Sequence, residues 1–179
     1  MAIQINGSGT ITGISTGGLP DGIVDTDMLA NGAVTNIKQG AGSIIQAKHL
    51  QFTTDLNGTA ASITDLSGFS LSITPTSTSS DIIIILHATM ALNCDGRVGL
   101  KRNGTQIVEH LIGTGRSNFA DDCGTYCGTY KDSPSSTSAV TYQVTVRASG
   151  CTNAYHINES TSGSTDNGRS GMTLLEIAG

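Results

Sequence analysis

Val140-Thr-Tyr-Gln-Val-Thr-Val-Arg-Ala148 alternates apolar and polar side chains over its whole length. Successive side chains of a β-strand point to opposite faces of a sheet, so in an extended chain the apolar residues all lie on one face. These residues are Val140, Tyr142, Val144, Val146 and Ala148. The pattern predicts a strand whose apolar face belongs to a hydrophobic core, while Thr145, on the other face, is directed toward solvent or a polar interface.

Other stretches show the same strand character. Phe69-Ser-Leu-Ser-Ile-Thr74 alternates apolar and hydroxyl side chains and is ended by Pro75. The apolar run at 82–86 extends to about Leu92, well short of the roughly 20 residues of a membrane span, and is predicted to be a buried strand. The closing segment Met172-Thr-Leu-Leu-Glu-Ile177 is mostly apolar and is therefore predicted to be a central strand.

Asn103-Gly104 lies between two short apolar runs, 99–101 and 106–108. Both residues tolerate the positive φ angles of a tight turn, so a β-hairpin is predicted here. In all, about ten short strands separated by turn residues are predicted in the last ~130 residues, a spacing typical of an antiparallel sandwich or barrel. The sequence therefore predicts an all-β fold, and we favour a jelly-roll-like β-sandwich.

The composition agrees with a loop-rich β protein. Of the 179 residues, 13% are charged, 4% are aromatic and 23 are Gly. The high β-branched content and the net charge of only −5 argue against disorder. Because the basic residues are scattered, no nucleic-acid partner is expected. Residues 1–7 lack the basic start and the apolar stretch of a signal peptide, so we expect synthesis in a cytoplasm and no membrane insertion.

Three consecutive decapeptides near the amino terminus repeat, at residues 22–31, 32–41 and 42–51. Each begins with Gly and has a β-branched residue at its third position, namely Val24, Val34 and Ile44. Ten residues are a whole number of strand repeats, so an extended chain keeps these side chains on one face. One unit has too few apolar groups for a core of its own and is expected to pack on other units or other chains. A flexible Gly/Thr/Asn linker is the alternative.

The residues of these repeats resemble those of known virion proteins. Asp21-Gly-Ile-Val24, Asn31-Gly-Ala-Val-Thr35 and the trailing Lys38 and Lys48 are similar to the glycine-punctuated repeats of bacteriophage tail fibres and other virion surface proteins. This resemblance covers roughly residues 1–51. The segment 73–83 and the closing Thr-Leu-Leu-Glu-Ile-Ala-Gly also look like parts of such phage modules.

The resemblance implies a structural protein of a bacteriophage virion, synthesised in the cytoplasm of a host bacterium and displayed on the virion surface. It implies a homotrimeric capsid decoration protein or short fibre. Residues 1–51 would form an extended anchor and stem, and residues 52–179 the β-sandwich head. In the stem, Val24, Val34 and Ile44 of three chains would stack about the trimer axis. The partners would be its own copies and proteins of the capsid, tail or baseplate.

Four Cys and four His raise the question of a metal site. Zinc ligands usually come in closely spaced pairs, and only Cys123 and Cys127 form one here, so neither a metal nor another cofactor is expected. A bend at Gly124-Thr125 would bring the two sulfurs together as a disulfide, formed after release from a reducing cytoplasm. The other two cysteines are expected to be buried thiols.

No enzymatic activity is expected. Asp121-Asp122 and Asp25-Thr-Asp27 lack the spacing of a calcium loop, and adjacent side chains of an extended chain point to opposite faces, so both are expected in solvated loops. The sequence contains no nucleophile elbow and no phosphate-binding loop. His87 follows the most apolar run and is expected to be a core or interface residue rather than a base.

An alternative function is that of a carbohydrate-binding receptor-recognition module of a tail fibre. Its partner would be a host-surface glycan. Sites of that kind usually stack exposed aromatic rings on the sugar. The candidates for glycan contact are Phe119, Tyr126 and Tyr130, which cluster near one loop.

Overall fold

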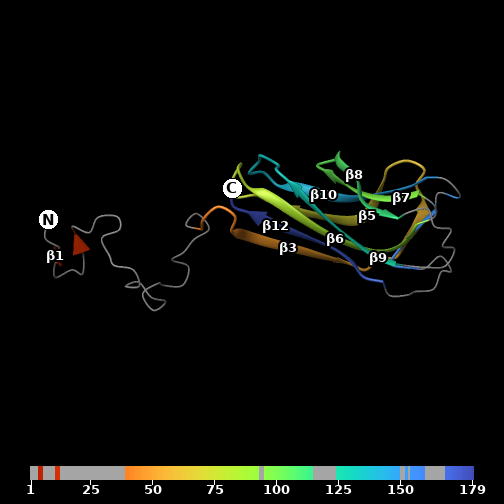
Figure 1. Ribbon diagram of the computed structural model, residues 1–179, viewed down its shortest axis with the longest axis horizontal. Coiled ribbons are helices and arrows are strands. Elements are labelled where there is room, and N and C mark those ends of the chain that lie inside the picture. The colour runs from red at the N-terminus through yellow and green to blue at the C-terminus, as the bar shows by residue number, and fades with distance from the viewer. Residues whose placement is uncertain are drawn as a thin grey trace. The chain divides into compact units, whose positions relative to one another are not determined.

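The computed structural model describes residues 4–5, 11–12, 39–92, 95–114, 124–149, 152, 154–159 and 168–179. The chain divides into two units, Met1–Gln39 and Gly40–Gly179. In the first unit, β1 (Gln4–Ile5) pairs with β2 (Ile11–Thr12) in an antiparallel ladder. The second unit, which we call the head, carries all the other described strands (Figure 1).

The described part of the head consists of antiparallel strands and turns, without a helix, which confirms the all-β prediction. Its strands are β3 (Ile44–Phe52), β4 (Leu56–Thr59), β5 (Thr64–Ile73), β6 (Asp81–Leu92), β7 (Asp95–Arg102), β8 (Thr105–Thr114), β9 (Gly124–Asp132), β10 (Val140–Ser149), β11 (Ala154–Ile157) and β12 (Ser170–Ile177).

The strands of the head pair in a nested order. The two strands at the middle of the chain, β7 and β8, pair with each other. Each strand before β7 then pairs with the strand at the same distance after β8: β6 with β9, β5 with β10, β4 with β11 and β3 with β12. One sheet has the order β5-β10-β7-β8, while in the other β12 lies between β3 and β6, and β6 also pairs with β9 and β11. The two sheets are the two layers seen in Figure 1. A long hairpin rolled into two sheets in this way is a jelly roll, which confirms the predicted sandwich.

The hairpin at the centre of this nest joins β7 and β8. It turns at Asn103 and Gly104, whose φ angles are 47° and 83°. Both are positive, as a two-residue hairpin turn matched to the strand twist requires. The predicted hairpin is therefore confirmed.

The hydrophobic core lies between the two sheets. The apolar face of β10 is buried as predicted, and Tyr142 and Val144 have no exposed surface. β6 contributes three completely buried side chains to the same core, Ile82, Ile84 and Leu86. Both β6 and β12 have neighbours on either side, so the strand at 82–86 and the central place of the terminal strand are confirmed. The run itself is buried on one face only, because Ile83 is half-buried and Ile85 is exposed on the outer face.

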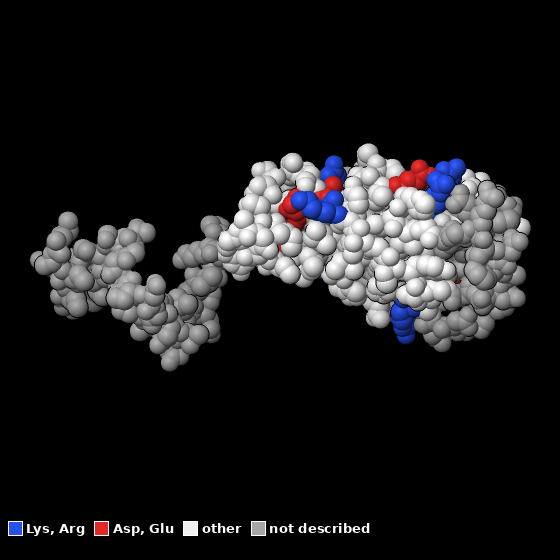
Figure 2. All heavy atoms as spheres, in the orientation of Figure 1, with Lys and Arg blue, Asp and Glu red and all other residues white. Residues whose placement is uncertain are grey.

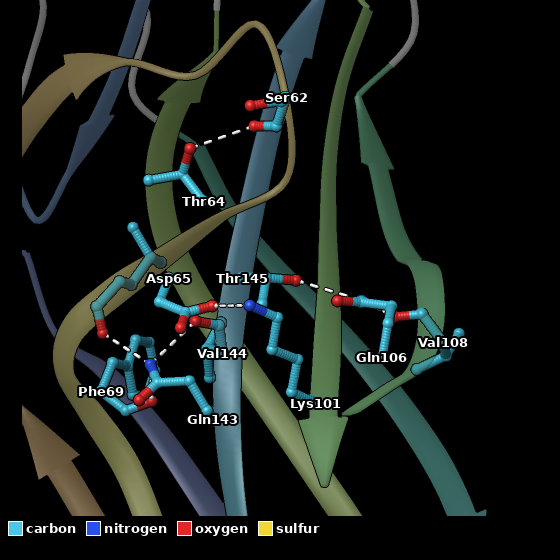
Figure 3. A network of polar contacts seen from close by, with 11 residues as sticks. Ser62, Thr64, Asp65, Phe69, Lys101, Gln106, Val108, Gln143, Val144 and Thr145 are labelled. Carbon is cyan, nitrogen blue, oxygen red and sulfur yellow. Dashed lines mark hydrogen bonds and ion pairs between the residues drawn. The ribbon is translucent and has the colours of Figure 1, made fainter. Parts of the chain in front are cut away.

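Thr145 differs from the prediction, because it is only 2% exposed although it lies on the outer face of β10. Gln106 of β8 lies over it, with Nε2 3.3 Å from Thr145 Oγ1 and 2.6 Å from the Val108 carbonyl oxygen (Figure 3). Gly99, which pairs with Thr145, makes room for this amide, since a Cβ there would lie 2.7 Å from the same Nε2. The alternation predicts the correct face, but a side chain from another strand covers it.

The third decapeptide repeat belongs to the head. β3 begins at Ile44 and pairs with β12 along its length, and the ring of Phe52 stacks on Phe69 with centroids 4.5 Å apart. The head therefore begins near residue 40, and not at residue 52 as expected. The physical reason is that β12 needs a ladder partner on its second edge, and the extended repeat supplies one. The other two expected stem residues, Val24 and Val34, lie outside the described residues.

Along one edge of β6, β12 pairs with residues 81–87 and β11 with residues 90–92, and Asn158 forms hydrogen bonds where these two strands meet. Its Nδ2 donates to the carbonyl oxygens of Phe52 and Thr54, both at 3.0 Å, and its Oδ1 accepts from Ser170 Oγ at 2.7 Å. Its own N–H donates to Thr89 O at 2.8 Å. Asn158 is fully buried with a φ of 63°, a conformation that Asn tolerates better than most residues.

A buried polar contact joins the two sheets at one end of the sandwich. Asp132 of β9 accepts a hydrogen bond from the Tyr142 hydroxyl of β10 at 2.7 Å. Its two oxygens also lie 2.9 and 3.0 Å from Arg102 Nη1 of β7. Burial, and then the hydrogen bond to Asp132, raises the pKa of Tyr142 well above its usual value. The phenol therefore stays protonated and acts as a donor.

A second buried carboxyl group, that of Glu176 in β12, fixes the loop between β5 and β6. Its Oε1 accepts from the Thr76 N–H at 2.7 Å and the Thr76 hydroxyl at 2.8 Å, and its Oε2 accepts from Gln46 Nε2 at 2.6 Å. Burial by itself would raise the pKa of Glu176, but these hydrogen bonds lower it below its ordinary value. The fold therefore favours the ionised form of this side chain.

Glu176→Gln is expected to lower the stability at pH 7 by about 1–3 kcal/mol, because an amide cannot accept all three hydrogen bonds. A carboxyl group with a lowered pKa stabilises the fold above its unfolded-state pKa, and that contribution is lost as the pH falls through the folded-state pKa. The parent should therefore lose more stability than Glu176→Gln below about pH 4.5. Urea titrations at pH 7, 5 and 3.5 measure this; parallel losses in the two proteins would contradict it.

Candidate interaction surface

The outer face of the sheet β5-β10-β7-β8 is covered by polar side chains. Lys101 Nζ lies 2.6 Å from Asp65 Oδ1, and Arg147 Nη1 lies 2.7 Å from Glu109 Oε1. Gln143 Nε2 donates to the carbonyl oxygens of Leu66 and Phe69 in β5 (Figure 3). These long side chains shield the backbone while keeping their charges in water. This face is suited to solvent.

The outer face of the opposite sheet is different, because its strands present apolar residues on both sides. Alternation in β6 turns two isoleucines away from the core, and their neighbours in β12 and β3 follow from the strand register. We call the large apolar side chains that point outward from this sheet the apolar face: Ile44, Ile83, Ile85, Leu175 and Ile177. Ile85 is 39% exposed and Ile44 56% exposed.

Small and uncharged side chains surround the apolar face. Thr129 of β9 and Thr173 of β12 pair with Ile85 from either side. His87, two residues further along β6, is half-buried and lies over Gly171, where a Cβ would come within 2.6 Å of the imidazole. The border of the apolar face can therefore form hydrogen bonds, although its centre cannot.

At one end of this outer face, two charged side chains lie beside the apolar face. Among the outward residues of β3, β12, β6 and β9, those with charged side chains are Asp81 and Lys131. Their Oδ2 and Nζ atoms form an ion pair of 2.6 Å, and Ser133 Oγ donates to the same carboxylate at 2.5 Å. The bond from Lys131, and then that from Ser133, lowers the pKa of Asp81. The two charges therefore neutralise each other.

The space-filling view agrees with this distribution of charge. Figure 2 shows the Lys, Arg, Asp and Glu side chains gathered at a few places, with most of the visible described surface uncharged. Within the part of the chain that the structure describes, no group of three or more His, Cys, Asp and Glu side chains lies together as metal ligands would. The same residues include no helix that is long and apolar enough to cross a membrane.

Two of the aromatic candidates for glycan contact are not exposed in the way that the sequence suggests. Tyr126 and Tyr130 lie on the inward side of β9, half-buried, and pack against the hydrophobic core. The strand period places Gly128 with them and turns the residues between them outward. A partly buried ring does not offer a sugar a free stacking surface. Phe119 lies outside the described residues.

The bend expected next to the cysteine pair is not found. The bend expected at Gly124-Thr125 is absent, because both residues belong to the extended strand β9. Cys127 has a free thiol, is exposed and pairs with His87 of β6. Cys123 lies outside the described residues.

The apolar face is the feature that sequence reasoning missed. The run at 82–86 is interpreted above as a buried strand because it is apolar throughout. A strand with one solvated face alternates, so a run apolar at both parities signals that both of its faces avoid water. Ile83 and Ile85 gave this signal in the sequence. That Leu175 and Ile177 of β12 lie on the same face as these two isoleucines follows only from the pairing of β6 with β12.

Comparison with known proteins identifies no family. No family model matches the chain, and no curated protein matches it. A chain in the structure of infectious bursal disease virus Gx strain is similar, with 12% identity and a TM-score of 0.43 over 76% of this chain and 33% of that one. Dimeric latent PorU from Porphyromonas gingivalis has 8% identity and a TM-score of 0.38 over 78% of this chain and 14% of that one. This chain thus spans a third or less of either similar chain.

Proposed function

We propose that the chain is a non-enzymatic structural protein of a bacteriophage virion, a homotrimeric capsid decoration protein or short fibre that attaches by its amino-terminal segment and displays the jelly-roll head. The observation that carries this proposal is the decapeptide repeat. Its third positions, Val24, Val34 and Ile44, are apolar in units too small to have a core. Ile44 is the most exposed large apolar side chain in the described part of the head.

Trimer formation would give these side chains the partners that a single chain lacks. Each one fully buried contributes on the order of 1.5–3 kcal/mol before the cost of ordering the chain. Closed cyclic symmetry is the usual way in which identical chains bury such positions. The proposed partners are the other two copies and a protein of the capsid, tail or baseplate, with no metal, cofactor or nucleic acid.

The oligomeric state is the first test of this proposal. Sedimentation equilibrium of the full chain is expected to give three times the chain mass of 18.3 kDa. The physical reason is that burial of the repeat positions needs copies of the chain. A concentration-independent monomer would contradict the trimer.

The location of the protein is the second test. A gold-labelled antibody against the head should decorate phage particles at symmetry-related positions on the capsid or the tail. Particles without label, prepared from cells that make the protein, would refute the virion assignment. A glycan array tests the carbohydrate-binding alternative, which the inward positions of Tyr126 and Tyr130 make less favourable.

A further inference from the structure

Two side chains of the apolar face stand out for their exposure. Among the residues that the structure describes, Ile44 and Ile85 are the two most exposed large hydrophobic side chains, at 56% and 39%. Both lie on the same outer face of the same sheet. Scattered exposed apolar side chains are ordinary, but a group of them on one face marks a contact surface.

The opposite face of the sandwich shows how this chain treats a surface that stays in water. There, ion pairs such as Lys101 with Asp65 and long amides such as Gln143 cover the sheet. The apolar face has no such cover: Ile83 lies beside Leu175, and Ile85 lies beside the bordering Thr129 and Thr173. The difference lies between two sheets of one domain, so it reflects their surroundings and not the composition of the chain.

We propose that the apolar face packs against the neighbouring copies of this chain in the trimer, so that Ile44, Ile85 and Leu175 lie at subunit contacts. This inference rests on the trimer of the proposed function. It adds that the head itself takes part in the contact, and it names the sheet that does so. Each of three copies can turn the same sheet toward a threefold axis.

The position of Ile44 in the sequence favours a second copy as the occupant. Ile44 is the third member of the series Val24, Val34 and Ile44, which the repeat predicts to face the trimer axis. The structure places this third member at the start of β3, paired with Ile177 on the apolar face. One of the three repeat positions thus lies on the apolar face of the head.

Charge also favours a second copy. The chain has a net charge of −5, so two copies repel each other at most orientations. Among the described outward residues of β3, β12, β6 and β9, those with charged side chains are Asp81 and Lys131, and they are paired with each other at 2.6 Å. An uncharged face is one on which like-charged copies can approach without burying an unpaired charge.

The experiment places a charge on the apolar face in the full chain. Ile85→Lys is expected to weaken trimer association by roughly a hundredfold, because the ammonium group loses its water in the contact. Ile85→Thr, which keeps a β-branched side chain, should weaken it by about tenfold. Ser72→Lys is the matched control: Ser72 is exposed on the outer face of the other sheet, and its substitution should leave association unchanged. Sedimentation velocity over a concentration series measures all four proteins, with circular dichroism melts to show that each is folded.

Cys127 provides an independent readout, because it lies two residues from Thr129 on the same outer side of β9. Its alkylation by iodoacetamide, followed by peptide mass spectrometry, should be slow in the parent trimer and at least tenfold faster in Ile85→Lys. Equal rates in the two proteins would show that copies of the chain do not cover the face.

The outcomes separate this inference from the function on which it rests. A parent trimer whose association is unchanged by both Ile85 variants overturns the docking of the head and leaves a trimer held elsewhere. A parent monomer overturns the trimer and the docking together. Protection of Cys127 that appears only when the protein is bound to particles would assign the face to another virion protein, which also overturns the inference.

Discussion

Val144→Asp is expected to prevent the head from folding. Val144 has no exposed surface and lies between the two sheets, in the strand that pairs with both β5 and β7. A carboxylate there loses its water without gaining a partner, which costs several kcal/mol, comparable with the whole stability of a small domain. Expression should fall sharply, or the cooperative thermal transition followed by circular dichroism should disappear.

Ser72→Asp is the matched control for this variant. Ser72 lies in β5 on the outer face of the same sheet, is exposed, and bonds to Thr141 Oγ1 at 2.7 Å. Its substitution should change the stability by less than about 1 kcal/mol, since the new charge stays in water. Thr145 is not a suitable control, because it is buried beneath Gln106. Equal effects of Val144→Asp and Ser72→Asp would show that the strand register is wrong.

Asp132→Ala is expected to lower the free energy of unfolding by about 3–5 kcal/mol. The substitution leaves the buried Tyr142 hydroxyl without its acceptor and Arg102 without its carboxylate. It also removes a link between β9 in one sheet and β7 and β10 in the other. Urea unfolding at pH 7 measures the loss.

Tyr142→Phe tests whether the loss arises from this contact. It removes the hydroxyl and keeps the buried ring, so by itself it should cost about 1–2 kcal/mol. The double variant should be less destabilised than the sum of the two single variants, because the orphaned hydroxyl is no longer present. Additive effects would mean that the two side chains act independently, contrary to the 2.7 Å hydrogen bond.

Local patterns were sufficient for the strands and for the central hairpin. The alternation of residues 140–148 predicts the buried face of β10, and Asn103-Gly104 predicts the turn between β7 and β8. Both depend on neighbours in the chain, namely the two-residue period of a strand and the positive φ of two adjacent residues. The apolar content of β12 also predicts its central place, and β12 lies between β3 and β6 in the sheet.

The candidate site depended on contacts that are distant in the sequence. The exposure of Ile85 depends on what packs beside it, and its neighbours Thr129 and Thr173 are more than 40 residues away. The same holds for the half-buried Tyr126 and Tyr130, which the sequence places near a loop but the fold turns toward the core. Periodicity indicates which side chains share a face, but it does not indicate what covers that face.

The sequence by itself therefore determined the all-β class, the core face of the longest alternating strand, the central hairpin and the repeat with its apolar third position. Only the tertiary structure decided that the third repeat is β3 of the head, that Gln106 covers Thr145, and that one outer face is polar and the other apolar. The physical reason is the separation along the chain over which each interaction acts. Backbone preference and alternation act between residues next to each other in the chain, whereas burial is set by strands that meet only when the hairpin is rolled into two sheets.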